Sequence, residues 1–444
     1  MKSLPLTALV PLVLFSCAAP MSSSVPTPPS APAPELNSRF GPVAERYVKL
    51  VLDVGQHDDG YVDAYYGPAE WKTTAAARKL PLEQLLMEAN ALRGLIAGID
   101  VGTAPEMERL RKEYLDKQLS AVAARIEMLR GRKFTFDEES RALYDAVAPT
   151  FPDSHFRVVL DSLSALLPGT EPLPDRLEAF RRAYVIPPDK IDNVFRAAIA
   201  ESRRRTAARL KLPPAEEFVL EYVKDKPWSG YNWYQGNAKS LIQINIELPI
   251  FIDRAIDLAA HEGYPGHHVY NALLEQRLVR DRGWVEFTVY PLFSPQSLIA
   301  EGSANYGIEV AFPGAERIEF EKRVLFPLAG LDPAGADEYY RVQKLLSRLA
   351  HASNDVARQY LDGRIDADEA ARRLTAFALY APERARQRIR FFDTYRSYVI
   401  NYNLGKDLVQ EWIEKQGGTD ANPERRWQLF EQLISSPRLP SGLR

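Results

Sequence analysis

The sequence predicts a mainly α-helical protein with a small β-sheet near its middle. Over long segments on both sides of residue 215, apolar residues recur every three or four positions, which is the period of a helix. Near the middle, residues 218–223 are instead β-prone and residues 240–245 alternate every second residue, as in half-buried strands. Residues 18–34, by contrast, are almost entirely Ala, Pro, Ser, Thr and Val, a composition that cannot form a core.

The amino terminus is predicted to be a targeting segment. The apolar stretch 4–15 is too short to span a bilayer but fits the core of a signal peptide, and it leads into Leu14-Phe15-Ser16-Cys17, which resembles a bacterial lipoprotein signal. We therefore predict a signal peptide over residues 1–16 and a Pro/Ser-rich tether over residues 17–35, with lipid on Cys17. The alternative is that Cys17 is incidental to an ordinary cleaved signal. The lipid would anchor the protein to the membrane of a bacterial cell envelope.

Charge and cysteine content narrow the possible partners and ligands. With 56 basic and 59 acidic residues, the net charge of -3 gives no broad attraction to nucleic acid, so no nucleic-acid partner is expected. The basic run 203–205 is interpreted as a solvated helix face. Because Cys17 is the only cysteine, disulfides within the chain are impossible, and a metal site would need histidine, carboxylate or water.

Helices fill the segment before residue 213, which we expect to form an N-terminal helical lobe over residues 36–212. The periodicity predicts helices at about 36–56, 81–98, 104–131, 137–147, 155–167 and 187–211. The clearest is 104–131, where apolar side chains repeat every three or four residues. His57, beside Asp58 and Asp59 in a Gly-containing loop, could belong to a ligand cluster, but a solvated turn is favoured.

A second lobe, residues 213–444, is expected to carry the site and the β-element. Residues 218–223 and 240–245 are strand-like, with an aromatic-rich segment between them, which fits a hairpin or small sheet. A strand edge beside the site would be placed to pair with an extended peptide. Helices are predicted to follow at about 267–280, 295–311, 334–361, 367–379 and 382–400.

Three of the six histidines fall within the eight residues His261-Glu262-Gly263-Tyr264-Pro265-Gly266-His267-His268. The run before them has helical spacing, so His261 and Glu262 are expected on a helix. Zinc peptidases place two histidines four apart on such a helix, with a glutamate as the base between them. Here a regular helix would put the second histidine roughly 9 to 10.5 Å farther along, so the helix must be deformed, and Pro265-Gly266 supplies a distortion.

The motif leaves the second ligand open between two histidines. An insertion of two residues would make His267 the ligand, and an insertion of three would select His268. We favour His267 and assign His268 to orienting the substrate or stabilising an oxyanion. Glu262 would then take a proton from a metal-bound water. The alternative is that adjacent histidines after Pro-Gly merely cap a helix.

Glu301 is the candidate third ligand. It lies in an otherwise apolar, small-residue segment, where burial of a lone carboxylate is costly without a partner. Zinc would be that partner, and small neighbours would let this helix approach the motif helix closely. Asn305 and Glu309, on a similar face, are candidates to support the ligands. The alternative is a glutamate on a solvated face.

Taken together, these residues resemble a bacterial family of candidate zinc metallopeptidases, often lipoproteins, long catalogued as a domain of unknown function. The matching motifs are His261-Glu262-x-x-Pro265-Gly266-His267-His268, Glu301-Gly302-x-Ala304-x-Tyr306 and Tyr402-x-x-Gly405, in order over roughly residues 215 to 410. The resemblance implies a helical zinc-peptidase fold with His261, a second histidine and Glu301 on zinc, and Glu262 as base. It also implies that Tyr402 hydrogen-bonds the tetrahedral intermediate, with an ordinary packed tyrosine as the alternative.

The chain departs from the family pattern at two places. Ser303 stands where the family usually has tryptophan, and Arg396-Ser397-Tyr398 stands where it has Pro-Gly-Gln. These differences weaken any transfer of substrate preference but leave the proposed ligands untouched. His351 also falls where members tend to carry a histidine, and an ordinary core or surface histidine is the alternative.

The leading hypothesis is a zinc-dependent peptidase acting on a peptide substrate. One alternative is a non-catalytic binding or scaffold lipoprotein of the envelope with a structural metal site. The other keeps the zinc chemistry but gives it a non-peptide amide or ester.

Overall fold

The computed structural model describes residues 34–444 of the chain, and these residues lie in one compact unit. The predicted signal peptide, most of the predicted tether and the lipid site Cys17 lie outside the described residues. The division into two lobes near residue 213 stays a prediction. No helix within residues 34–444 is both long enough and apolar enough to cross a membrane.

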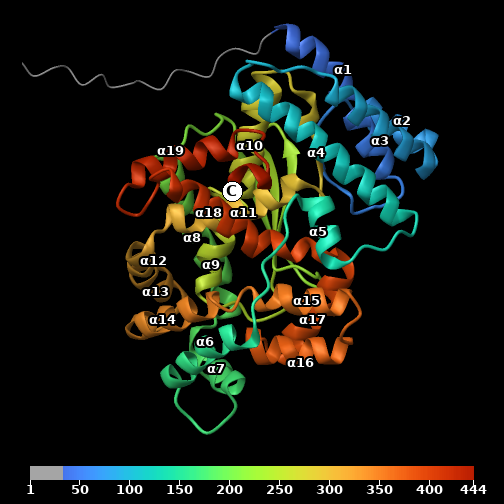
Figure 1. Ribbon diagram of the computed structural model, residues 1–444. Coiled ribbons are helices and arrows are strands. Elements are labelled where there is room, and N and C mark those ends of the chain that lie inside the picture. The colour runs from blue at the N-terminus through green and yellow to red at the C-terminus, as the bar shows by residue number, and fades with distance from the viewer. Residues whose placement is uncertain (1–33) are drawn as a thin grey trace, which may run out of the picture. The chain divides into compact units, whose positions relative to one another are not determined.

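The described residues are mainly helical, which confirms the fold class. The α-helices are α1 (Pro34–Val54), α2 (Ala69–Arg78), α3 (Leu82–Ala97), α4 (Glu106–Leu129), α5 (Phe136–Tyr144), α6 (Asp153–Leu166), α7 (Leu173–Arg181), α8 (Ile191–Ala207), α9 (Asp253–Leu258), α10 (His267–Leu274), α11 (Pro295–Ala311), α12 (Gly314–Phe320), α13 (Phe326–Ala329), α14 (Ala336–Ser347), α15 (Ala352–Leu361), α16 (Ala367–Ala378), α17 (Pro382–Tyr395), α18 (Ile400–Lys415) and α19 (Pro423–Ile434) (Figure 1).

Shorter turns join these helices. The 3-10 turns are η1 (Arg182–Tyr184), η2 (Pro188–Lys190), η5 (Val285–Thr288), η7 (Pro333–Gly335), η8 (Arg396–Val399) and η9 (Pro440–Leu443). The π-helical turns are η3 (Ala259–Gly263), η4 (Glu275–Arg280) and η6 (Glu321–Leu325). Because π-turns often occur at functional sites, the position of η3 inside the histidine motif is notable.

Two small sheets accompany the helices. The expected sheet contains β2 (Glu217–Val223), β3 (Gly230–Gly236) and β4 (Lys239–Asn245) in the order β2-β4-β3. Strands β3 and β4 form an antiparallel hairpin, while β2 pairs with β4 in parallel. A second pair, β1 (Val62–Tyr65) with β5 (Val289–Pro291), is antiparallel and was not predicted. Strand β3 is therefore an edge strand, and it leads through β4 into the motif helix.

Most predicted helices lie where the periodicity placed them, with two differences. The segment 334–361 is not one helix, since it breaks between Ser347 and Ala352 into α14 and α15. The segment 382–400 is likewise interrupted, by η8 between α17 and α18. Helices α2, α7, α12 and α13 were not predicted from the sequence.

Helices α11 and α18 lie side by side in the middle of the described unit (Figure 1). Their backbones touch at two glycines, because a Cβ atom on Gly302 would lie 2.4 Å from the carbonyl oxygen of Gly405. No larger residue fits at Gly302 without separating the helices. This contact fixes the position of Glu301 relative to the residues that precede α18. The small residues around Glu301 thus bring α11 close to α18, rather than serving only an approach to the motif helix.

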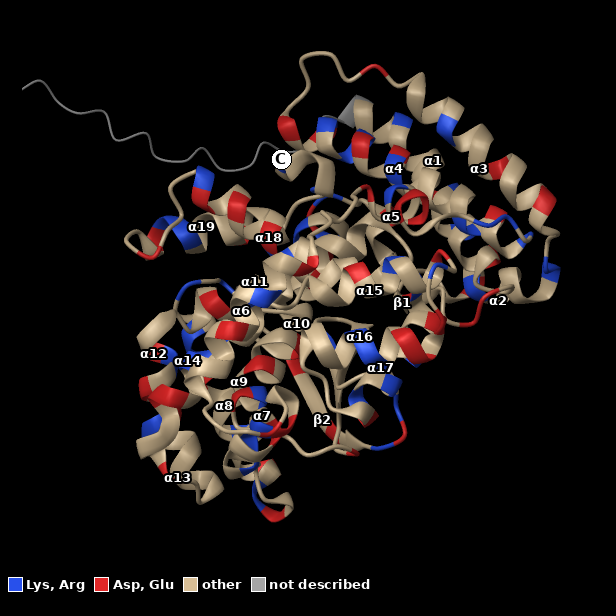
Figure 2. Cartoon of the chain, turned by 60° about the horizontal axis from the view of Figure 1, so that its bottom comes forward, with Lys and Arg blue, Asp and Glu red and all other residues tan. Residues whose placement is uncertain are grey.

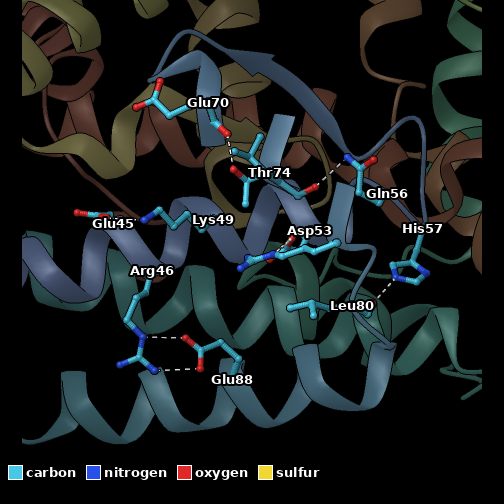
Figure 3. A network of polar contacts seen from close by, with 12 residues as sticks. Glu45, Arg46, Lys49, Asp53, Gln56, His57, Glu70, Thr74, Leu80 and Glu88 are labelled. Atoms are coloured by element: carbon cyan, nitrogen blue, oxygen red, sulfur yellow. Dashed lines mark hydrogen bonds and ion pairs between the residues drawn. The ribbon is translucent and has the colours of Figure 1, made fainter. Parts of the chain in front are cut away.

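Two features predicted to be ordinary surface have defined partners. The exposed ring of His57 lies with Nε2 2.8 Å from the carbonyl oxygen of Leu80, as Figure 3 shows, which agrees with a solvated turn rather than a ligand cluster. Within the run 203–205, Arg203 and Arg204 are exposed, whereas Arg205 is largely covered and pairs with Glu201. Acidic and basic residues are interspersed over the helices (Figure 2).

Candidate metal centre

The histidine motif is a helix interrupted at the residues that the sequence singled out. Helix α9 continues into the π-turn η3, the regular path stops at Tyr264, and α10 begins at His267. Two backbone hydrogen bonds that span more residues than those of an α-helix bridge the interruption. The Tyr264 amide donates to the Ala259 carbonyl oxygen over 3.1 Å, and the Gly266 amide donates to that of Ala260 over 2.9 Å. The predicted deformation of the helix is therefore present.

Gly266 is required by close approach of the backbone. A Cβ atom at this position would lie 1.9 Å from the carbonyl oxygen of His261 and 2.5 Å from that of Ala260. The chain can fold back over the turn that carries His261 only because Gly266 has no side chain. As a result the side chain of His267, which begins the next helix, returns to the side of His261.

Three potential ligand atoms converge. The Nε2 atoms of His261 and His267 are 3.1 Å apart, and they lie 3.2 Å and 3.6 Å from Oε2 of Glu301. Ligands about 2.0 to 2.1 Å from a tetrahedral zinc are themselves roughly 3.3 Å apart, so the three separations suit such an ion. Among the described residues these three form the group of histidines and carboxylates able to hold a metal.

Glu301 is buried, with 6% of its surface exposed, and its two oxygens have different surroundings. Oε1 accepts a 2.8 Å hydrogen bond from the hydroxyl of Tyr398. Oε2 has no well-directed hydrogen-bond donor among the described residues, although both imidazoles approach it. A buried carboxylate oxygen without a donor is costly, and a cation at this point would satisfy it. The donor set therefore fits a metal ion.

The protonation of the cluster reflects the same crowding. Burial raises the pKa of Glu301, but the nearness of His261 and His267 outweighs it and lowers the pKa below its ordinary value. Burial lowers the pKa of His267, whereas the neighbouring carboxylates, with Glu301 first, raise it to about 9. Metal binding would release this proton, because a histidine ligand must be neutral.

Glu262 lies beside the cluster, facing the same cavity. It is 4% exposed, and burial raises its pKa above the ordinary value. Its backbone carbonyl accepts a 2.8 Å hydrogen bond from the side-chain amide of Asn232 on β3. A Cβ atom on Gly230 would lie 2.8 Å from Oε1 of Glu262, so the edge strand passes directly over this carboxylate. A carboxylate with a raised pKa is suited to exchange protons near neutral pH.

The position of His268 corrects its predicted role. Its side chain is fully buried, with Nε2 3.1 Å from Oε2 of Glu216 and Nδ1 2.9 Å from the Ser240 hydroxyl. It does not line the cavity that contains the cluster. Adjacent residues of a helix point about 100° apart, so when His267 faces the cluster, His268 must face the sheet. It cannot orient substrate from there.

Of the other candidate site residues, two line the cavity and two lie outside it. Tyr402 lines the cavity, close to the cluster, and Asn305 lines it too while donating to the Tyr402 carbonyl oxygen over 3.1 Å. Glu309 points away and pairs with Lys406 at the surface. His351 lies outside the cavity, with Nε2 2.8 Å from Asp407. Glu309 and His351 are thus not brought to the cluster.

The cluster opens into a cavity of about 290 Å³, near the lower end of the roughly 300 to 1,000 Å³ of small-molecule sites. Three of its residues were missed from the sequence. Tyr398 contacts Glu301, and Asp63 accepts a short hydrogen bond from the Tyr231 hydroxyl. Burial raises the pKa of Asp63 to about 6. Asp63 lies on the unpredicted strand β1, so no local signal marked it. Tyr398 stands four residues before Tyr402, one helical turn away, which is a signal that could have found it.

Fold and cavity define a mainly helical protein with a candidate metal centre of two histidines and a glutamate. No family model matches the sequence, and no curated protein matches it. Among solved structures, a candidate lipoprotein from Colwellia psychrerythraea is 15% identical with a TM-score of 0.46, covering 82% of this chain and 72% of that one.

Two further solved structures are similar at the same low level. A candidate lipoprotein of unknown function from Shewanella oneidensis is 12% identical with a TM-score of 0.41, covering 82% of this chain and 76% of that one. A carboxypeptidase from Pyrococcus furiosus, described as apo-Mg, is 12% identical with a TM-score of 0.43, covering 90% and 88%. Because these scores are below 0.5, the function must be argued from the site.

Proposed function

We propose that this protein is a zinc-dependent peptidase in which His261, His267 and Glu301 hold the metal. The observation that carries the proposal is the convergence of three ligand atoms, one of them a buried oxygen without a hydrogen-bond donor, in a cavity that also contains the carboxylate of Glu262. The two-histidine, one-glutamate set is typical of catalytic zinc, since it leaves a fourth position open.

Zinc, when bound, would lower the pKa of a water molecule and polarise a carbonyl group. The chain's own groups do the rest. Glu262 accepts a proton from the attacking water at its carboxylate and can return it to the leaving nitrogen. Tyr402 donates a hydrogen bond from its hydroxyl to the carbonyl oxygen as negative charge develops there. Tyr398 holds Glu301 in place through Oε1.

The peptide class of substrate is supported by the edge strand. Residues Ser229, Gly230, Tyr231 and Asn232 line the cavity, and β3 is the outer strand of its sheet. An extended peptide can hydrogen-bond to the free edge of such a strand, which would bring its carbonyl groups past Glu262. A binding protein or a hydrolase of small amides or esters would not require this edge.

The proposed location is the bacterial cell envelope, with lipid on Cys17 holding the protein at a membrane. It rests on the lipoprotein-like sequence 14–17 alone. Replacing Cys17 with alanine should release the protein into the soluble fraction and abolish labelling by a radioactive fatty acid. Unchanged labelling would refute the anchor.

The function is tested by metal analysis of the purified full chain together with hydrolysis of a peptide pool. We expect close to one zinc per chain and cleavage of peptides. Glu262→Gln should keep the zinc and lose at least about 100-fold in activity, since general acid–base groups contribute about 10²- to 10⁴-fold. Glu309→Gln makes the same chemical change at the surface and should behave like the parent.

Three results would overturn the proposal. Purified protein without near-stoichiometric zinc would remove its basis. Zinc without cleavage of peptides, amides or esters would favour a scaffold with a structural metal. Cleavage of small amides or esters but not of peptides would place the same chemistry on a different substrate.

A further inference from the structure

Helix α17 presents a continuous polar and aromatic stripe to the cavity. Its cavity-lining residues follow one another at intervals of three, one, three and four, which places them on one face of the helix: Arg384, Gln387, Arg388, Phe391 and Tyr395. The stripe begins with two arginines and ends with aromatic residues beside Tyr398. The cavity therefore has a wall whose basic part is separate from the metal cluster.

Arg384 and Arg388 carry positive charge without an acidic partner. Neither forms an ion pair with a carboxylate among the described residues, and the side chains that act most strongly on Arg384 are Tyr380, Arg254, Arg388 and Arg181. The Nε atom of Arg388 donates to the Ser353 hydroxyl over 3.2 Å, and its guanidinium lies over the rings of Phe391 and Phe392, so its contacts are a hydroxyl and aromatic faces rather than a carboxylate.

A nearby arginine shows the contrast. Arg254, which also lines the cavity, has Nη1 3.0 Å from Asp257, and Asp257 is shared with Arg317. The fold thus supplies a carboxylate to Arg254. It supplies none to Arg384, whose side chain is exposed to the solvent of the cavity. Two guanidinium groups on adjacent helical turns, one exposed and one partly buried, and both without a carboxylate partner among the described residues, form a site for an anion.

The two ends of the cavity are close enough for one peptide. The guanidinium of Arg388 lies 5.9 Å from the ring centre of Tyr402, whose ring is 5.9 Å from that of Tyr398, which in turn hydrogen-bonds Glu301. An extended chain of at most about five residues, at about 3.4 Å each, covers this distance. One peptide can therefore place an anionic group at the arginines and a peptide bond at the metal cluster.

We infer that Arg384 and Arg388 bind a free carboxylate of the peptide, and so select substrates carrying one within a few residues of the cleaved bond. This inference rests on the proposed function, because it identifies the substrate of that site. A planar guanidinium matches a carboxylate with two parallel hydrogen bonds, which favours this anion on a peptide. The carboxylate is either the chain terminus or an acidic side chain, and the two are separated by the choice of probe.

The test measures binding rather than turnover, using full-length Glu262→Gln protein so that no probe is consumed. The probes are acetyl-trialanine acid, acetyl-trialanine amide, and acetyl-Ala-Glu-Ala amide, each titrated by calorimetry. We expect one of the two carboxylate probes to bind about 10- to 100-fold more tightly than the amide without a carboxylate. Tight binding of the first assigns the terminal carboxylate, and of the third the acidic side chain.

Arg384→Gln in the same background should reduce this preference to near unity, while Arg384→Lys should retain part of it. Arg386→Gln is the matched control, because Arg386 is on the same helix but pairs with Glu383 at the surface. Circular dichroism would confirm that each variant is folded. Equal binding of all three probes would overturn the inference, as would equal losses in Arg384→Gln and Arg386→Gln. The proposed function fails separately, through absent zinc or absent cleavage by the parent.

Discussion

Replacing Gly266 with alanine tests whether the interruption of the motif helix places the ligands. The added Cβ atom would lie 1.9 Å from the His261 carbonyl oxygen, 2.5 Å from the His261 carbonyl carbon and 2.5 Å from the Ala260 carbonyl oxygen. Ordinary contacts between such atoms are longer than about 3 Å, so the backbone of a ligand residue must shift by about 1 Å. Flexible side chains cannot relieve the clash, since every obstacle is main chain.

The substitution should lower both the free energy of unfolding and the affinity for zinc. Overpacking usually costs about 1 to 3 kcal/mol, and we expect at least the upper value because the backbone itself must move. With an unfolding entropy of about 2.1 cal/mol/K per residue, roughly 400 residues give about 0.9 kcal/mol/K, so Tm should fall by about 3 °C or more. Metal ligands tolerate displacements of only about 0.2 Å, so zinc affinity should fall at least about 100-fold.

Gly94→Ala provides the control. Gly94 lies within α3, and a Cβ atom there meets nothing within 4 Å. Alanine should therefore stabilise the helix by about 0.5 to 1 kcal/mol, as expected for glycine in a helix interior. Thermal unfolding by circular dichroism and zinc titration would be compared for both variants. If Gly266→Ala unfolds within 1 °C of the parent and binds zinc equally, the geometric argument for the motif is wrong.

Three further predictions concern the metal and the core. Tyr398→Phe removes the hydrogen bond to Glu301 and should weaken zinc binding about 10- to 100-fold in a competition titration with Tm of the metal-free form unchanged; an unchanged affinity would contradict the positioning role. With free zinc at 100 times its Kd, removal of the zinc should lower the free energy of unfolding by about 2.7 kcal/mol, or Tm by about 3 °C. An unchanged Tm would speak against a bound metal. Glu286→Gln leaves the fully buried Arg111 without its partner and should cost about 3 to 5 kcal/mol in urea unfolding, whereas Arg111→Met combined with Glu286→Leu should cost much less.

Much of the architecture is readable from the sequence because it depends on local periodicity. Helices such as α4 and α11, and strands β2 and β4, each carry along their own length a pattern typical of their type. What was not readable depends on partners distant in sequence. Strand β1 is only four residues long and exists because β5, more than 200 residues later, pairs with it. The sequence of β1 alone does not indicate that β5 is its partner.

The candidate site divides in the same way. The motif 261–268 supplied two candidate ligands, a candidate base and the need for a break, because residues six and seven apart on a regular helix are too far apart to bind one ion. It left the choice between His267 and His268 open, since that depends on where the chain resumes. Gly266 determines which ring faces the cluster in the fold. Because it has no Cβ atom, the chain can turn back closely, and α10 begins with His267 beside His261. His268 then faces Glu216.

The groups that would decide substrate choice lie outside any motif. Arg384 and Arg388 come from α17, Asp63 from β1 and Tyr231 from β3, and they meet only in the folded cavity. Arginines along an amphipathic helix usually form a solvated face. Helix α17 also carries Arg386 and Arg390 on its other side, so its sequence does not show which arginines line a cavity. Only the placement of one face against the cavity separates Arg384 from Arg386. The two residues are therefore a matched pair, alike in chemistry and different in position, and the comparison of their glutamine variants isolates what the fold adds to the sequence.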